Sequence, residues 1–160
     1  MIASGIFLSK LSYLIAVWSN CNKDLLKALQ VQQNRVARLI TRNNWEVRTV
    51  DNFKQIGWLS VNQLAFYHTI LAMKQIRDSK NPAYLHSIFD WDYKYMTRQA
   101  TSSKIKPEGI PRLEIAKTSF RWRAPEFFNS LPSYIANEAS LETFKSRAKM
   151  WIKENVTFNP

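Results

Sequence analysis

Apolar residues recur at helical spacing through much of the chain, and segment 22–42 is the clearest case. On a helical wheel, five of its apolar residues fall within roughly 100° of one another: Leu25, Leu29, Val36, Leu39 and Ile40. Five basic residues fall on the opposite side: Lys23, Lys27, Arg35, Arg38 and Arg42. This pattern predicts a helix capped by Asn20 or Asn22 and ending near Arg42, with one face in the core and a basic stripe opposite.

Two further segments combine an apolar period with a capping signal. Ser60, followed three residues later by Gln63, is the pattern of a capping box for a helix from Val61 to about Asp78. Ser140 can cap a last helix, which runs to about Glu154. Six apolar side chains of the three long helices are expected to be buried: Leu29, Val36, Leu64, Leu71, Phe144 and Trp151.

Shorter elements are predicted before and between these helices. Residues 3–19 are apolar with few charges, so they are expected to form a buried helix, or a helix whose original neighbour is missing. A helical turn that begins at Thr49 or Asp51 can end at Gly57, because glycine adopts the left-handed C-cap conformation without steric cost.

Prolines divide the remainder of the chain. Asn81-Pro82 ends the second long helix and begins a brief helix through Ile88. Pro125 can open another short helix, which Pro132 closes. Between them, residues 93–123 lose the helical period. The predicted fold is therefore all-α, a compact bundle of about five to six helices in one domain over residues 1–160, with an irregular segment, 93–123, before the last helices.

Composition narrows the choice of partner. The chain has 160 residues and a net charge of +11, and residues 93–123 hold eight basic and two acidic residues. Such a charge favours a polyanion, with nucleic acid ahead of an anionic membrane. Only three glycines occur, which argues against a glycine-rich phosphate loop. The apolar amino terminus is interrupted by Lys10, so neither a signal peptide nor a membrane span is expected.

Cysteine and histidine usage offers no metal site. Cys21 is the only cysteine, and His68 and His86 are the only histidines, so no zinc-ligand spacing is present. A single cysteine fits a reducing, intracellular compartment, cytoplasmic or nuclear. Cys21 with either histidine could form a thiolate–imidazole pair. The simpler interpretation places Cys21 at a helix junction and His68 as a packed or surface residue.

An ordered set of motifs spans residues 11–152: LSYLIAVWSN, LLKALQVQQNRVARLIT, IGWLSVNQ, MTRQ, SFRWRAPEFFNSLP and FKSRAKMWI. This succession resembles the carboxy-terminal region of jockey-like non-LTR retrotransposon reverse transcriptases. The family has a Trp-Gly pair where this chain has Trp18-Ser19, and a Trp-Asn-x-Leu-Pro motif where it has Phe128 before Asn129. The resemblance implies a helical region that follows the polymerase palm and thumb.

The catalytic residues of that family lie outside the resembling region. The polymerase holds two metal ions with an aromatic-x-Asp-Asp turn, and this chain contains no Asp-Asp pair. Asp90-Trp91-Asp92 is the nearest approach, and a polar turn is the better interpretation of it. We therefore expect no enzyme activity, no cofactor, no metal and no small-molecule substrate.

Nucleic-acid binding is the chemistry that the residues favour, because Phe120 to Arg123 alternate aromatic rings with guanidinium groups. Two alternatives stay open: the two aromatic residues pack inward while the arginines face solvent, and the basic stripe is only a solvated helix face. The hypothesis is a non-catalytic accessory domain that holds template RNA or target DNA. The alternative is a protein-interaction or structural module that packed on the polymerase thumb, with the rest of a reverse transcriptase or another protein as its partner. The residues expected to contact nucleic acid are Lys27, Arg35, Arg38, Arg42, Lys94, Arg98, Lys104, Lys106, Arg121, Trp122 and Arg123.

Overall fold

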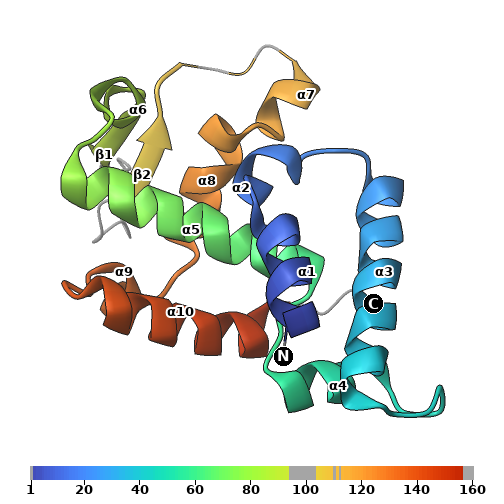
Figure 1. Cartoon of the computed structure of the whole chain (residues 1–160). Helices are drawn as coiled ribbons and strands as arrows, with labels where there is room; N and C mark the ends of the chain where they lie inside the picture. Colours follow the sequence, from blue (N-terminus) through green and yellow to red (C-terminus); the bar gives the residue numbers. More distant parts are fainter. Residues whose placement is uncertain (1, 94–103, 110, 112, 157–160) are drawn as a thin grey trace. The chain divides into compact units, whose positions relative to one another are not determined.

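The computed structural model describes residues 2–93, 104–109, 111 and 113–156 (Figure 1). About two thirds of these residues are helical, which confirms the predicted helical fold class. The structure also contains a small two-stranded antiparallel sheet, which was not predicted. The chain forms two compact units, one made of residues 1–68 with 149–160 and the other of residues 69–148.

Among the described residues, the first unit consists of four complete helices and parts of two others. Its elements are α1 (Ile2–Ser12), α2 (Ile15–Trp18), α3 (Lys23–Thr41), α4 (Thr49–Ile56), the first half of α5 (Val61–Ser79) and the end of α10 (Leu141–Asn155). The expected single helix over residues 3–19 is interrupted, because Leu14 adopts a left-handed φ of 49°. The indole of Trp18 donates to the Tyr13 carbonyl oxygen at 2.7 Å across this break.

The predicted caps of the first unit form as expected. The side chain of Asn22 accepts a hydrogen bond from the Asp24 amide at 3.1 Å, which starts α3. Gly57 ends α4 with a left-handed φ of 71°. At the start of α5, the Ser60 amide donates to Gln63 Oε1 at 3.1 Å and the Gln63 amide donates to Ser60 Oγ at 3.3 Å. The capping box is therefore confirmed.

The core of the first unit gathers where α1, α3 and α4 meet. Ala37, Phe53 and Trp58 are buried together, and Phe7 stacks on Trp58 with ring centroids 6.0 Å apart. Val36 and Ile40 of α3 are only partly buried against this cluster.

The predicted core face of α3 was wrong. Leu25 is 58% exposed and Leu39 is 78% exposed, whereas Gln30, Gln33 and Ala37 are the buried residues of this helix. The buried side is rotated about 90° from the apolar stripe, because two glutamine side chains reach the backbone at the start of α5. Gln33 Nε2 donates to the Leu59 carbonyl oxygen at 2.8 Å. The Val61 amide donates to Gln30 Oε1 at 2.8 Å.

The second unit contains the sheet. Its elements are the second half of α5, α6 (Ala83–Ser87), β1 (Phe89–Tyr93), β2 (Lys104–Pro107), α7 (Glu114–Lys117), α8 (Phe120–Asn129), α9 (Ser133–Ala136) and the first half of α10. In the sheet Phe89 pairs with Pro107 and Asp90 with Lys106, and the register shifts before Tyr93. Residues 93–123 therefore hold more regular structure than the expected irregular segment: they include β2, α7 and the start of α8.

Helix α8 starts earlier than predicted. Pro125 lies inside it rather than at its first position, and Ser119 precedes it as the N-cap residue. A proline at this position removes one backbone donor, so the Arg121 carbonyl oxygen loses its usual partner four residues on. Pro125 is buried, so packing compensates for the missing hydrogen bond.

The Phe128-Asn129-x-Leu131-Pro132 motif has a structural role in the second unit. The Asn129 side chain pairs with the backbone of Ile105, donating to its carbonyl oxygen at 2.7 Å and accepting from its amide at 3.0 Å. Phe128 and Leu131 are buried, and Phe128 stacks on Phe144 with centroids 6.4 Å apart. The motif thus joins α8 to β2.

Burial was predicted correctly for two of the six apolar side chains expected in the core. Leu64 and Phe144 are buried, whereas Leu29, Val36, Leu71 and Trp151 are half-buried. In the part of the chain that the structure describes, no helix is both long and apolar enough to cross a membrane.

Candidate nucleic-acid interface

Three arginines converge at the carboxyl end of α3. Arg35, Arg38 and Arg42, together with Leu39 and Asn43, line an open surface depression of about 530 Å³. Their spacing of three and four residues places the three guanidinium groups on one side of the helix. Arg35 and Arg42 are exposed and Arg38 is half-buried. We call this set the arginine cluster.

Polar contacts with α4 hold the end of α3 in place. Arg42 takes a left-handed φ of 55° and ends the helix. The Asn43 side chain then donates to Asn52 Oδ1 at 2.6 Å and to Gln55 Oε1 at 3.1 Å. Thr41 Oγ1 donates to the same Asn52 oxygen at 3.1 Å. Since Asn52 is buried, these bonds anchor Asn43, which lines the depression beside the arginine cluster.

The electrostatics of the arginine cluster favour an anion. Among the residues described at this end of the helix, no carboxylate lines the depression. The Arg38 Nε–H group is buried and lacks a hydrogen-bond partner among the described residues. Three like charges side by side repel one another, and a phosphate would both remove this repulsion and accept the donated hydrogen bonds.

Lys27 lies on α3 outside the arginine cluster. It is about 12 Å along the helix axis from Arg35, at 1.5 Å per residue. Its ammonium group is 3.9 Å from Asp24 Oδ1, and both side chains are largely exposed. Such an ion pair contributes little, so Lys27 remains available to a polyanion but does not share the depression.

Among the described residues, those predicted in the second unit lie on two elements, β2 and α8. Lys104 is exposed on β2, whereas the Lys106 ammonium lies 4.2 Å from the centroid of the Tyr93 ring. Arg121 and Arg123 are on α8, where the side chains of residues two apart point in directions about 160° apart. Lys94 and Arg98 lie outside the described residues.

Contacts within the second unit engage both arginines of α8, although the Nε–H group of Arg121, like that of Arg38, is buried without a hydrogen-bond partner among the described residues. Arg121 donates to the Glu108 carbonyl oxygen at 2.5 Å, and the Arg123 guanidinium lies 5.6 Å from the centroid of Phe127. Burial lowers the pKa of Arg123 from its ordinary value. Trp122 is half-buried. All four residues of the Phe120–Arg123 run are half-buried, so the strand-like alternation of inward rings and outward charges does not occur.

A cleft in the second unit was missed by the sequence prediction. Arg77, Lys80, His86, Trp91 and Lys104 are among the residues that line a space of about 800 Å³. Arg77 has a structural role there, since it donates to the Ala136 carbonyl oxygen at 2.6 Å and its guanidinium lies 5.1 Å from the centroid of Phe128. A basic residue after a helix carries no sequence signal that distinguishes it from an ordinary surface lysine, so Lys80 could not have been found.

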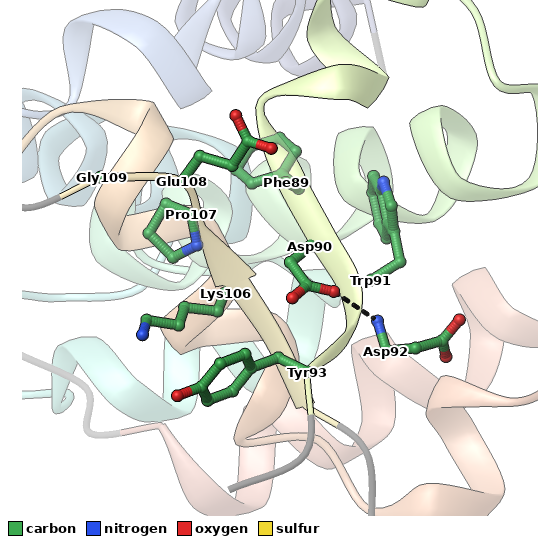
Figure 2. Close-up of a pocket in the computed structure, with 9 residues that line it drawn as sticks. All are labelled: Phe89, Asp90, Trp91, Asp92, Tyr93, Lys106, Pro107, Glu108 and Gly109. Atoms are coloured by element: carbon green, nitrogen blue, oxygen red, sulfur yellow. Dashed lines mark hydrogen bonds between the residues drawn. The ribbon is translucent and has the colours of Figure 1, made fainter.

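Asp90 and Asp92 do not form a metal-binding pair in this structure. They lie on strand β1, so the predicted polar turn was wrong. Figure 2 shows the Asp92 carboxylate turned away from that of Asp90, which instead accepts the Asp92 backbone amide at 3.2 Å. Glu108 lines the same depression, of about 520 Å³. Within the described ranges, no group of three or more His, Cys, Asp or Glu residues could hold a metal ion.

The cysteine and histidine contacts of the first unit are local. Cys21 is half-exposed at the junction of α2 and α3, and its thiol lies 3.8 Å from the Asn22 carbonyl oxygen. The His68 ring packs edge-on against Tyr67 with centroids 5.4 Å apart. Burial lowers the pKa of His68. These contacts are those of a helix junction and a packed histidine.

Comparison with known proteins gives no further identification. Neither a protein-family model, nor a curated protein, nor a solved structure matches the chain.

Proposed function

We propose that this chain is a non-catalytic nucleic-acid-binding accessory region of a retroelement reverse transcriptase. In this proposal, residues 1–160 hold template RNA or target DNA through phosphate contacts, and the polymerase chemistry belongs to another part of the enzyme. The order of motifs from LSYLIAVWSN to FKSRAKMWI supports the family. The observation that carries the binding function is the convergence of Arg35, Arg38 and Arg42 on one depression.

The spacing of the arginine cluster suits a nucleic-acid backbone. Along the axis of α3, Arg35 and Arg38 are about 4.5 Å apart, and Arg38 and Arg42 are about 6 Å apart. A guanidinium group donates in a fixed fork to phosphate oxygens, so three in a row can follow successive phosphates. Phosphate contacts fix the position of a strand without reading its sequence, as holding a template requires.

Salt dependence provides a quantitative test. Each phosphate neutralised on a single strand contributes about 0.7 to the slope of log affinity against log salt. Replacing all three arginines by glutamine should therefore reduce the slope by up to about 2. The assay is fluorescence anisotropy of a labelled single-stranded RNA oligonucleotide, and in parallel of duplex DNA, between about 50 and 200 mM salt.

A matched control removes three charges elsewhere in the same unit. Lys54, Lys149 and Lys153 are exposed and lie outside the arginine cluster. Their triple glutamine variant has the same net charge as R35Q/R38Q/R42Q and should keep most of the wild-type slope. Equal losses in the two variants would mean that binding follows net charge alone. Absence of wild-type binding at low salt would reject the proposed function.

A protein-interaction module is the second candidate. The specific observation in its favour is the exposed apolar surface of α1 and α3, which includes Ile6 and Leu39.

A further inference from the structure

Helices α1 and α3 enclose an open apolar groove of about 680 Å³ within the first unit. Its floor is formed by Phe7, Leu11, Trp18, Leu29 and Val36, and Ile6 and Leu39 stand at its edges. The groove contains most of the apolar stripe of α3 that the sequence placed in the core.

The inner wall of the groove is anchored in the core of the first unit. Phe7 stacks on the buried ring of Trp58, and Val36 packs against the same cluster. The edges, in contrast, are open to solvent: Ile6 is 57% exposed and Leu39 is 78% exposed. A contiguous apolar surface of this kind, on a preformed wall, is typical of a site that binds another protein.

Charged residues stand on both walls. Lys10 of α1 lines the groove itself. On the α3 side Leu39 lines both the groove and the depression of the arginine cluster, so Arg35 and Arg42 follow directly beyond that edge. Among the described lining residues of either depression there is no carboxylate. Since the chain carries a net charge of +11, a second copy of it is disfavoured as the occupant.

We propose that this groove binds an amphipathic helix of a partner protein, whose apolar stripe is flanked on both sides by acidic residues. Leucine-like anchors spaced three and four residues apart would occupy the apolar floor, as in other helix-in-groove complexes. Acidic residues beside that stripe would face Lys10 on one wall and Arg35 and Arg42 on the other, which sets the charge of the partner. This interaction goes beyond nucleic-acid binding, because its anchors occupy the apolar floor of the groove, while Arg35 and Arg42 border both sites.

The test uses a designed helical peptide as the probe. Its sequence carries leucines at helical spacing with glutamates on both flanks, and a second peptide has lysine in place of every glutamate. Titration calorimetry with the full chain should show binding of the glutamate peptide, and the lysine peptide should bind at least about tenfold more weakly.

Two double variants locate the binding surface. I6N/L39N changes the edges of the groove, and V17N/V31N changes two exposed apolar residues of α2 and α3 outside it. All four side chains are well exposed, so both variants should fold, with circular dichroism as the check. I6N/L39N should weaken the glutamate peptide by at least about tenfold, whereas V17N/V31N should change its affinity by less than about threefold.

Several outcomes would overturn the proposal. These are the absence of binding, equal affinity for the two peptides, or equal losses in the two variants. Sedimentation that shows wild-type dimers dissociated by I6N/L39N would assign the groove to a second copy of the chain instead. RNA affinity is measured separately on Ile6→Asn alone, because Leu39 also lines the depression of the arginine cluster. RNA affinity should survive Ile6→Asn, so a failure here is distinguishable from a failure of nucleic-acid binding.

Discussion

Gln30 is expected to be a large contributor to stability among the polar residues of α3. It is 4% exposed, and its Oε1 atom accepts the amide of Val61, the first residue of α5. Val61 is itself buried, so no solvent can replace this acceptor. Methionine has a similar length and no acceptor of comparable strength. Gln30→Met should therefore leave a buried backbone donor without a partner.

The expected cost follows from that unpaired donor. Leaving a buried donor unsatisfied costs about 1–3 kcal/mol, so Gln30→Met should lower the free energy of unfolding by that amount. The same substitution at Gln33 should cost less. It removes the donor to the Leu59 carbonyl oxygen, but it also removes Gln33 Oε1, a buried atom without a partner among the described residues. Gln32 is exposed on the same helix, and Gln32→Met should stay within about 0.5 kcal/mol of wild type.

Equilibrium unfolding in urea measures all three variants. Far-UV circular dichroism and tryptophan fluorescence should give coincident transitions, which justifies a single free energy of unfolding. A Gln30→Met value within about 0.5 kcal/mol of wild type would refute the assignment of this hydrogen bond as buried and unreplaced.

Three further results are expected. Burial lowers the pKa of His68 below 6.5, so on acidification the unfolded chain binds a proton at a higher pH than the folded chain does. The free energy of unfolding should therefore be full above about pH 6.5 and decline below it. Urea melts of His68→Gln should show a weaker decline. Arg123→Gln should lower the thermal midpoint more than Arg123→Met, because the Arg123 stem packs in a half-buried site beside Phe127, and neither should change the salt slope of RNA binding. Asp78→Asn should cost more than about 1 kcal/mol and more than Lys74→Met in urea melts, because it leaves a 2%-exposed ammonium without the carboxylate 2.8 Å away.

Local signals in the sequence predicted the helices well. The caps at Asn22, Gly57 and Ser60 depend on residues within four positions of each other, and all three form. The long helices that they bound appear with similar limits. Strand β1 was missed, although Phe89, Trp91 and Tyr93 alternate with aspartates at the period of a strand.

The orientation of the helices could not be predicted. Hydrophobicity placed Leu25 and Leu39 of α3 in the core, but hydrogen bonds of Gln30 and Gln33 to a segment some 30 residues away turn a different side inward. Such long-range polar contacts leave no periodic signal in the sequence. The same rotation leaves much of the apolar stripe of α3 outside the core, where Leu29, Val36 and Leu39 line the groove.

The candidate site was predicted in part. Arg35, Arg38 and Arg42 were on the expected list because their spacing places them on one helix face, and the structure brings them to one depression. Arg121 and Arg123 were expected from their position between aromatic residues, yet α8 directs them to different sides. Residues two apart in the sequence share one face only on a strand. The sequence predicted that the helix begins at Pro125, whereas α8 begins at Phe120.

The most direct measurement of nucleic-acid binding observes the arginine side chains themselves. Nitrogen-15 labelled arginine gives a separate Nε–H signal for each guanidinium group, and these signals can be followed as a single-stranded RNA oligonucleotide is added at low salt. The proposed binding predicts saturable shifts for Arg35, Arg38 and Arg42, and little change for Arg77 and Arg123, which are engaged within the second unit. Shifts confined to Arg77 and Arg123, or no shifts at all, would contradict it.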